Sequence, residues 1–174
     1  DSSLLASLID QIRSAVPGIA LRTTCMVGYP GETARRYNNL LHFIKEWQFD
    51  RMGAFVFSSQ EGTRAAELPG QVAKRVAARR LKKLMEQQRN IALQLNKNQV
   101  GKTLIVLIDH AISRSSKWYA GRTEFQAPKV DGQVYLYSSR PLNSGDWVRA
   151  RITDAAPYSM KAKVTEILAE LPTE

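Results

Sequence analysis

The spacing of apolar residues changes once along the chain, close to Gly101. Before that glycine, apolar residues recur at the three-and-four spacing of amphipathic helices, interrupted by short runs rich in β-branched and apolar residues. After it, apolar and polar residues alternate, as they do in half-buried strands. A helix buries one stripe of its surface, whereas a half-buried strand buries every second residue. The change of pattern therefore predicts an α/β part followed by an all-β part.

The first part of the chain predicts helices alternating with strands. Helices are expected over residues 4–16 and around 37–47, and strands over 19–27 and 51–57, before a polar loop over 58–70. A parallel connection between two strands needs a crossover segment, which a helix supplies. The order therefore favours a parallel sheet covered by helices.

A single long, basic helix is predicted over residues 71–98. Residues 71–99 hold eight Lys and Arg side chains and one acid, Glu86, a local charge of +7 in a chain whose net charge is +9. A segment of this kind is often a solvated helix face, and it is also typical of surfaces that contact nucleic acid or an acidic protein. Both interpretations stay open at this point.

Beyond Gly101, the chain contains five strand-like runs, over residues 103–108, 117–123, 132–137, 146–153 and 161–167. Turn residues such as Asp131-Gly132 separate them. Five short strands in so short a segment predict a small closed barrel, which leaves no exposed sheet edge. The expected domains are residues 1–70, the linking helix 71–99 and the barrel 100–174.

The composition excludes several classes of site. The only cysteine of the 174 residues, Cys25, rules out an intrachain disulfide, a CxxC zinc site and an iron–sulfur cluster held by this chain alone. We expect Cys25 to be a packed strand thiol, and the isolated His42 and His110 not to act as ligands. The sequence has no apolar run of membrane-spanning length and no signal-peptide pattern at its start, which favours the cytoplasm and no membrane partner.

The densest chemical motif is TCMVGYPGET, residues 24–33, in which a strand runs into two glycines and the start of a helix. Ligands of α/β sheets bind beyond the carboxyl ends of strands, where glycines allow close approach and helix starts present free N–H groups. The motif therefore predicts a cofactor-facing turn. The alternative is a capped turn in which Glu32 or Thr33 serves only the first helical turn.

Four segments of the first part resemble the last two strand units of the radical S-adenosylmethionine (radical SAM) methylthiotransferases. These segments are LRTT (21–24), VGYPGET (27–33), FDRMG (49–53) and FSSQEGT (57–63). The segments GRT (121–123) and APKVDG (127–132) are similar to TRAM, the small barrel that closes these enzymes. The resemblance covers nearly the whole chain.

The resemblance implies the carboxy-terminal portion of such an enzyme: the last βα units of a radical SAM partial (β/α) barrel, a long linking helix and a five-stranded TRAM/OB-like β-barrel. The parent enzymes use S-adenosylmethionine and two [4Fe–4S] clusters, whose cysteines this chain lacks, so we expect it to bind none of them and to be inactive alone.

The RimO branch, which we favour, adds a methylthio group to an aspartate of a small-subunit ribosomal protein. The alternatives are the MiaB-like branch, which modifies an adenosine of transfer RNA, and a non-catalytic module that binds RNA or ribosomal protein. The implied partner is thus a small-subunit ribosomal protein, with RNA as a further candidate.

Two sets of site residues are expected, and neither contains a catalytic or metal-binding residue. The resemblance implies a set that lines S-adenosylmethionine: Thr24, Met26, Val27, Gly28, Gly31, Glu32 and Phe57. In the barrel, bases that pair with phosphate or carboxylate are interleaved with aromatics that stack or pack. This substrate-binding set is Lys117, Trp118, Tyr119, Arg122, Arg149 and Arg151. The alternative is a half-exposed sheet with Trp118 in its core.

Overall fold

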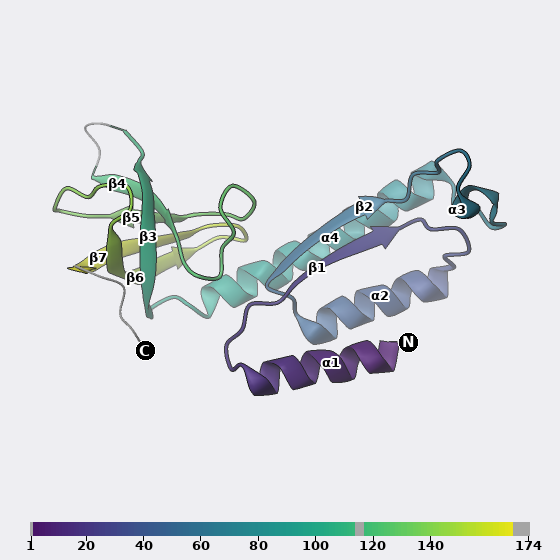
Figure 1. Cartoon of the computed structure of the whole chain (residues 1–174), viewed down its shortest axis with the longest axis horizontal. Coiled ribbons are helices and arrows are strands. Elements are labelled where there is room, and N and C mark those ends of the chain that lie inside the picture. Colours follow the sequence, from purple (N-terminus) through teal and green to yellow (C-terminus); the bar gives the residue numbers. More distant parts are fainter. Residues whose placement is uncertain (1, 114–116, 169–174) are drawn as a thin grey trace. The chain divides into compact units, whose positions relative to one another are not determined.

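The structure, a computed structural model, describes residues 2–113 and 117–168 (Figure 1). The chain divides into two compact units, Asp1–Ile91 and Ala92–Glu174, and the division falls inside the long helix α4. The first unit contains α1 (Ser2–Ala15), β1 (Arg22–Val27), α2 (Ala34–Trp47), β2 (Arg51–Val56), α3 (Arg64–Glu67) and most of α4 (Lys74–Lys97).

In the first unit, β1 and β2 form a parallel pair in register from Arg22 opposite Arg51 to Val27 opposite Val56. The crossover helix α2 begins at the Thr33 cap, whose hydroxyl accepts the N–H of Arg36, and ends where Gln48 adopts a left-handed conformation. Figure 1 shows α2 and α4 running alongside the two strands. The side chain of Gln88 on α4 donates to the carbonyl of Phe49 at 2.8 Å, and Gln87 donates to the carbonyl of Leu41 at 2.7 Å.

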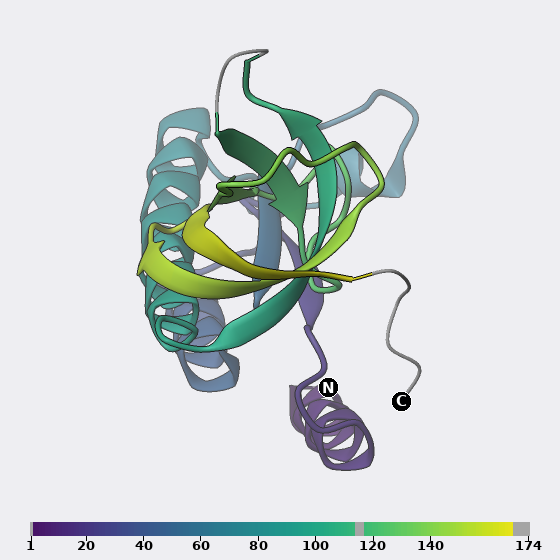
Figure 2. The same cartoon turned by 90° about the vertical axis from the view of Figure 1, so that its left-hand side faces the viewer.

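The second unit is a closed five-stranded barrel, seen in Figure 2. Its strands are β3 (Thr103–Ala111), β4 (Trp118–Arg122), β5 (Val134–Tyr137), β6 (Trp147–Ala155) and β7 (Met160–Leu168). They follow the order β3-β4-β5-β7-β6, and β6 pairs with β3 to close the barrel. The pair β5–β7 is parallel, and the other four pairs of these strands are antiparallel. Its interior is filled by side chains at most 1% exposed: Val106, Ile108, Val134, Leu136, Val148 and Ile152. The predicted fold class is confirmed.

The structure differs from the expected elements around residues 58–74. The predicted polar loop contains the short helix α3, and α4 begins at Lys74 instead of Gln71. The side chain of Gln71 donates to the carbonyls of Ala65, Ala66 and Leu68 at 3.0–3.2 Å. Gln71 thus supplies hydrogen-bond donors to the free carbonyls at the end of α3. The spacing of apolar residues does not reveal such a side-chain contact. None of the helices in the described part of the chain combines the length and apolar character needed to cross a bilayer.

We expect Gly132→Ala to destabilise the barrel, because a Cβ at Gly132 would overlap the main chain of Tyr158. Overpacking of this kind costs ~3 kcal/mol or more when backbone must move. The control is Gly53→Ala, whose Cβ would approach only the side chain of Thr24, at 3.8 Å. Urea denaturation followed by circular dichroism measures both, and equal unfolding midpoints would contradict the prediction.

Candidate functional site

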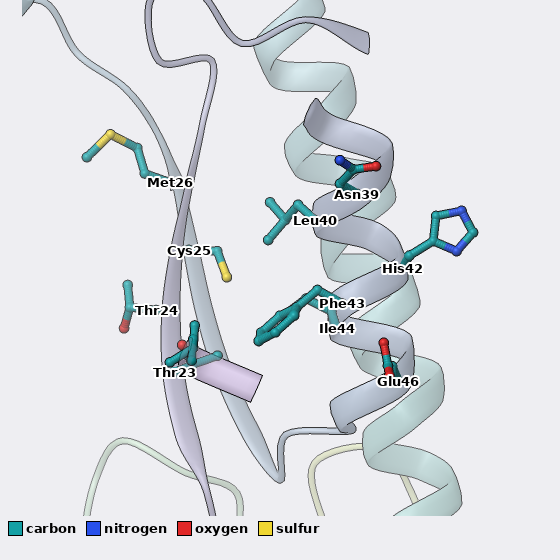
Figure 3. Close-up of a pocket in the computed structure, with 11 residues that line it drawn as sticks. Thr23, Thr24, Cys25, Met26, Asn39, Leu40, His42, Phe43, Ile44 and Glu46 are labelled. Atoms are coloured by element: carbon teal, nitrogen blue, oxygen red, sulfur yellow. The ribbon is translucent and has the colours of Figure 1, made fainter. Parts of the chain in front are cut away.

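The two faces of the β1–β2 sheet have different surroundings. Thr23 and Cys25 point toward α2, whereas Thr24 and Met26 point to the opposite side (Figure 3). On that opposite side, Met26 lies in register with Phe55, and their side chains are 42% and 47% exposed. We call this side, made of Thr24, Met26, Gly53 and Phe55, the open face. These adjacent exposed apolar side chains make the open face a candidate surface for a ligand or a further protein.

Two aromatic rings extend the open face at the carboxyl end of the strands. The N–H of Phe57 donates to the carbonyl of Val27 at 2.8 Å, which continues the ladder past β2. Tyr29, from the turn after β1, packs edge-on against Phe57 with ring centroids 5.2 Å apart. Because Gly53 has no side chain, space remains above Thr24. The open face therefore continues as an apolar wall up to the carboxyl ends of the strands, which is the end of an α/β sheet where ligands bind.

The turn after β1 is held close to α4. Gly28 has a φ of 77°, which side chains other than glycine rarely adopt, and a Cβ there would meet the Cβ of Ala77 at 2.6 Å. Gly31 has a φ of 79° and donates its N–H to the carbonyl of Gly70 at 2.8 Å. The two glycines therefore shape the turn and let α4 approach it.

Glu32 fastens this turn. Its Oε2 accepts the N–H of Gly28 at 2.6 Å, and its Oε1 accepts Nη1 of Arg80 at 2.8 Å. Both side chains of the pair are nearly buried, 12% and 13% exposed. Arg80 also lies 5.4 Å from the ring centre of Tyr37, whose hydroxyl donates to the carbonyl of Arg80. Burial, and secondarily the charge of Glu32, raise the pKa of Tyr37, which keeps that hydroxyl a donor.

The predicted cofactor set therefore separates into two groups. Thr24, Met26 and Phe57 are placed at the open face and its aromatic end, whereas Val27 is fully buried. Gly28, Gly31 and Glu32 build the turn, so we assign Glu32 a positioning role in place of ligand contact.

Sequence reasoning missed Tyr29, Gly53 and Phe55. The alternation in RMGAFVF contained the signal for two of them, because residues 53, 55 and 57 share one side of an extended chain.

A hollow of about 600 Å³ lies between β1, α1 and α2, and the β1 residues that line it include Thr24 and Met26 of the open face. Cys25 lines it, with its Sγ 3.8 Å from Sδ of Met52, while His42 points away from the strand (Figure 3). Burial raises the pKa of the Cys25 thiol. Across residues 2–113 and 117–168, no three or more His, Cys, Asp or Glu side chains gather in a way that would hold a metal ion.

In the barrel, the strand registers align a row of outward residues. Trp118 lies opposite Tyr137, Tyr137 opposite Lys163, and Lys163 opposite Arg151. We call these four residues the barrel row. The rings of Trp118 and Tyr137 pack edge-on at 5.6 Å, and Trp118 is 39% exposed, so it is not a core residue. No carboxylate in the described part of the chain forms an ion pair with Lys163 or Arg151.

The other predicted substrate residues are differently engaged. Tyr119 lies in the core at 6% exposure, and its hydroxyl accepts the N–H of Leu142. Arg122 is paired with Asp109, and Arg149 with Glu166. Lys117 is exposed just before β4. The row thus unites two residues of the predicted set, Trp118 and Arg151, with Lys163, a further base of the interleaved barrel strands, and Tyr137, which sequence reasoning missed.

Comparison with known proteins matches residues 100–165 to the TRAM domain family. The chain is similar to a protein from Desulforudis audaxviator named ribosomal protein uS12 methylthiotransferase RimO. The two sequences are 43% identical over 164 residues, which make up 94% of this chain and 36% of that protein. Proteins of the same name from Geotalea uraniireducens and Desulforamulus reducens are 42% and 39% identical over 92% and 91% of the chain. The chain spans about a third of the length of these relatives, 36% in each case. The resemblance stated from the sequence is confirmed.

We expect the Glu32–Arg80 pair to stabilise the first unit. Glu32→Ala should lower the free energy of unfolding by ~3 kcal/mol, because Arg80 is left nearly buried without its partner. The double variant Glu32→Ala/Arg80→Ala should lose less than the sum of the single variants, with a coupling of ~1 kcal/mol or more. Chemical denaturation measures the cycle. Glu46→Ala, at an exposed glutamate of α2, is the matched control, and full additivity of the pair would refute the coupling.

We expect Cys25 to react slowly with iodoacetamide in the folded chain. The thiolate is the nucleophile, and a raised pKa lowers its fraction at every pH below that pKa. At pH about 8, alkylation should be ~10-fold or more slower than in the same chain unfolded in urea. Mass spectrometry at timed intervals measures both rates. Equal rates would show that the fold neither shields the thiol nor raises its pKa.

Proposed function

We propose, because the chain is a relative of the RimO-type uS12 methylthiotransferases and includes a TRAM domain, that it forms the carboxy-terminal portion of a radical SAM enzyme. That enzyme would add a methylthio group to an aspartate of ribosomal protein uS12. The observation that carries the proposal is identity near 40% over more than nine tenths of the chain, which includes both compact units.

The open face suits S-adenosylmethionine. Met26 and Phe55 offer an apolar wall for a flat purine, Gly53 leaves room above Thr24, and the Tyr29–Phe57 ring pair closes the carboxyl end. S-adenosylmethionine, together with an iron–sulfur cluster, supplies the radical chemistry when bound. The residues of this chain bind and orient it. With a single cysteine, the chain supplies no three-cysteine set for a cluster, so other parts of the parent protein hold the [4Fe–4S] groups.

The same structure supports the proposal that the chain acts as part of a longer protein and is inactive alone. A parallel sheet of only two strands leaves one edge of β1 without a ladder partner in the described residues. On α1, Leu4, Leu5 and Leu8 are 72%, 46% and 49% exposed. Further barrel strands of the parent enzyme would pair with β1, and its other segments would cover the apolar side of α1. Such an enzyme would work in the cytoplasm, where ribosomal proteins are met.

The barrel row is our proposed surface for the ribosomal protein. Arg151 and Lys163 attract an acidic target loop, and the rings of Trp118 and Tyr137 pack against it. Lys117 lies next to the row in sequence. A second candidate, modification of an adenosine in transfer RNA, is favoured by the same combination of bases and exposed rings, which also binds single-stranded nucleic acid.

The test is methylthiolation by the full-length protein, reconstituted anaerobically and offered uS12 or transfer RNA. We expect a methylthio group to replace one hydrogen at an aspartate of uS12, so that the mass of uS12 increases by the difference between the two. Trp118→Ala/Arg151→Gln should lower kcat/KM by ~10-fold or more, mainly through KM, because central Trp and Arg contacts dominate interfaces. Phe125→Ala/Lys102→Gln, which removes an exposed ring and an exposed base elsewhere in the barrel, is the matched control. Modification of transfer RNA in place of uS12 would overturn the proposal.

A further inference from the structure

The outward side of α4 carries a stripe of bases. Its members are exposed and lie opposite the buried residues Ala77, Leu84 and Ile91. We call the following set the α4 stripe: Arg75, Arg79, Lys82, Lys83 and Arg89. With each residue turned by about 100°, all five fall within a sector of about 120°, and they span about 21 Å along the helix axis. The only acid among them is Glu86.

The described part of the chain offers the stripe no carboxylate partner. Arg80 belongs to the same run of sequence, but it turns inward and is held by Glu32. No ion pair joins a stripe residue to a carboxylate within the part of the chain that the structure describes. Like charges four residues apart, as in Arg75–Arg79 and Arg79–Lys83, destabilise a helix. If these positions served only the stability of the helix, acidic residues would alternate with the bases. We infer that an anion outside this chain offsets the charge of the stripe.

The form of the stripe favours phosphates over an acidic protein. Protein interfaces depend on aromatic and apolar anchors in a desolvated centre. The exposed residues without a positive charge over positions 75–90 are Ala78, Glu86 and Asn90, none of which is such an anchor. Phosphate contacts need only spaced cations, and the stripe places about one base per helical turn of 5.4 Å. Beside it, a hollow of about 320 Å³ is lined by Arg79, Lys83, Val76 and Tyr37, among others, which offers room for one phosphate group.

We propose that the α4 stripe binds the phosphate backbone of folded RNA, so that the enzyme meets its protein target within an RNA-containing particle. The part that concerns the target rests on the proposed function, whereas RNA binding by the stripe does not. The binding is electrostatic and independent of base sequence, because the stripe offers cations without a ring that stacks on a base.

The experiment uses the full-length protein and a fluorescein-labelled RNA hairpin, with anisotropy measured between about 50 and 200 mM salt. Arg79→Gln/Lys82→Gln/Lys83→Gln should reduce the slope of log affinity against log salt by about 2 to 3, since each phosphate contact contributes about 0.7 to 0.9. The loss of affinity should be the same for hairpins of unrelated sequence. The matched control, Lys45→Gln/Lys102→Gln/Arg140→Gln, removes the same charge from exposed residues that are not members of the stripe and should leave the slope unchanged.

Equal salt slopes for the stripe variant and the control would overturn the proposal. Binding of labelled poly-glutamate more tightly than RNA would also overturn it, in favour of an acidic protein partner. Methylthiolation of isolated uS12 and of uS12 in small ribosomal subunits is measured in parallel. No modification of either substrate would count against the proposed function alone, because the RNA-binding result is read separately. With activity present, we expect the stripe variant to lose more activity on the subunit than on isolated uS12.

Discussion

The carboxylate of Glu32 determines how the first unit is put together. It accepts the N–H of Gly28 on one oxygen and the guanidinium of Arg80 on the other, so one side chain joins the turn after β1 to α4. Because the pair is nearly buried and its hydrogen bonds are made, the cost of desolvating two charges is offset. Gly28 also lies close to Ala77 of the same helix, since a Cβ at Gly28 would meet the Cβ of Ala77 at 2.6 Å. Once α4 is fixed in this way, the open face remains available to a ligand.

The long helix α4 uses its polar residues in two separate ways. Those that face inward make specific bonds, such as Gln88 to the carbonyl of Phe49 and Arg80 to Glu32. Since the inward residues hold α4 in place, its outward residues are released from any role in packing. The charge of the α4 stripe is therefore compatible with a firmly attached helix. The sign and spacing of the stripe residues are then free to match a binding partner.

Much of the fold could be predicted from local pattern. The alternation of helices and strands and the period-two runs after Gly101 identify the sheet pair and the barrel, because each element buries a face that its own sequence defines. The site was less predictable, because it depends on partners distant in sequence. Glu32 could be a ligand or a turn residue until Arg80, 48 residues later, is seen beside it. Likewise, alternation places Trp118 and Tyr119 on opposite sides of β4 without saying which is outside, and only the barrel closure decides that Tyr119 is in the core.

The two surfaces that we assign to binding differ in chemistry, and this difference indicates different tasks. The α4 stripe has cations without rings. Such a surface suits contacts to the phosphate backbone of an RNA-containing particle, which give affinity without recognising the base sequence. The barrel row combines Lys163 and Arg151 with the rings of Trp118 and Tyr137, and such a surface discriminates by shape and stacking. Two weak contacts on one polypeptide raise the effective concentration of each for its own target. A target that offers both RNA and the right protein loop would then be preferred over one that offers either alone, without a tight site for either.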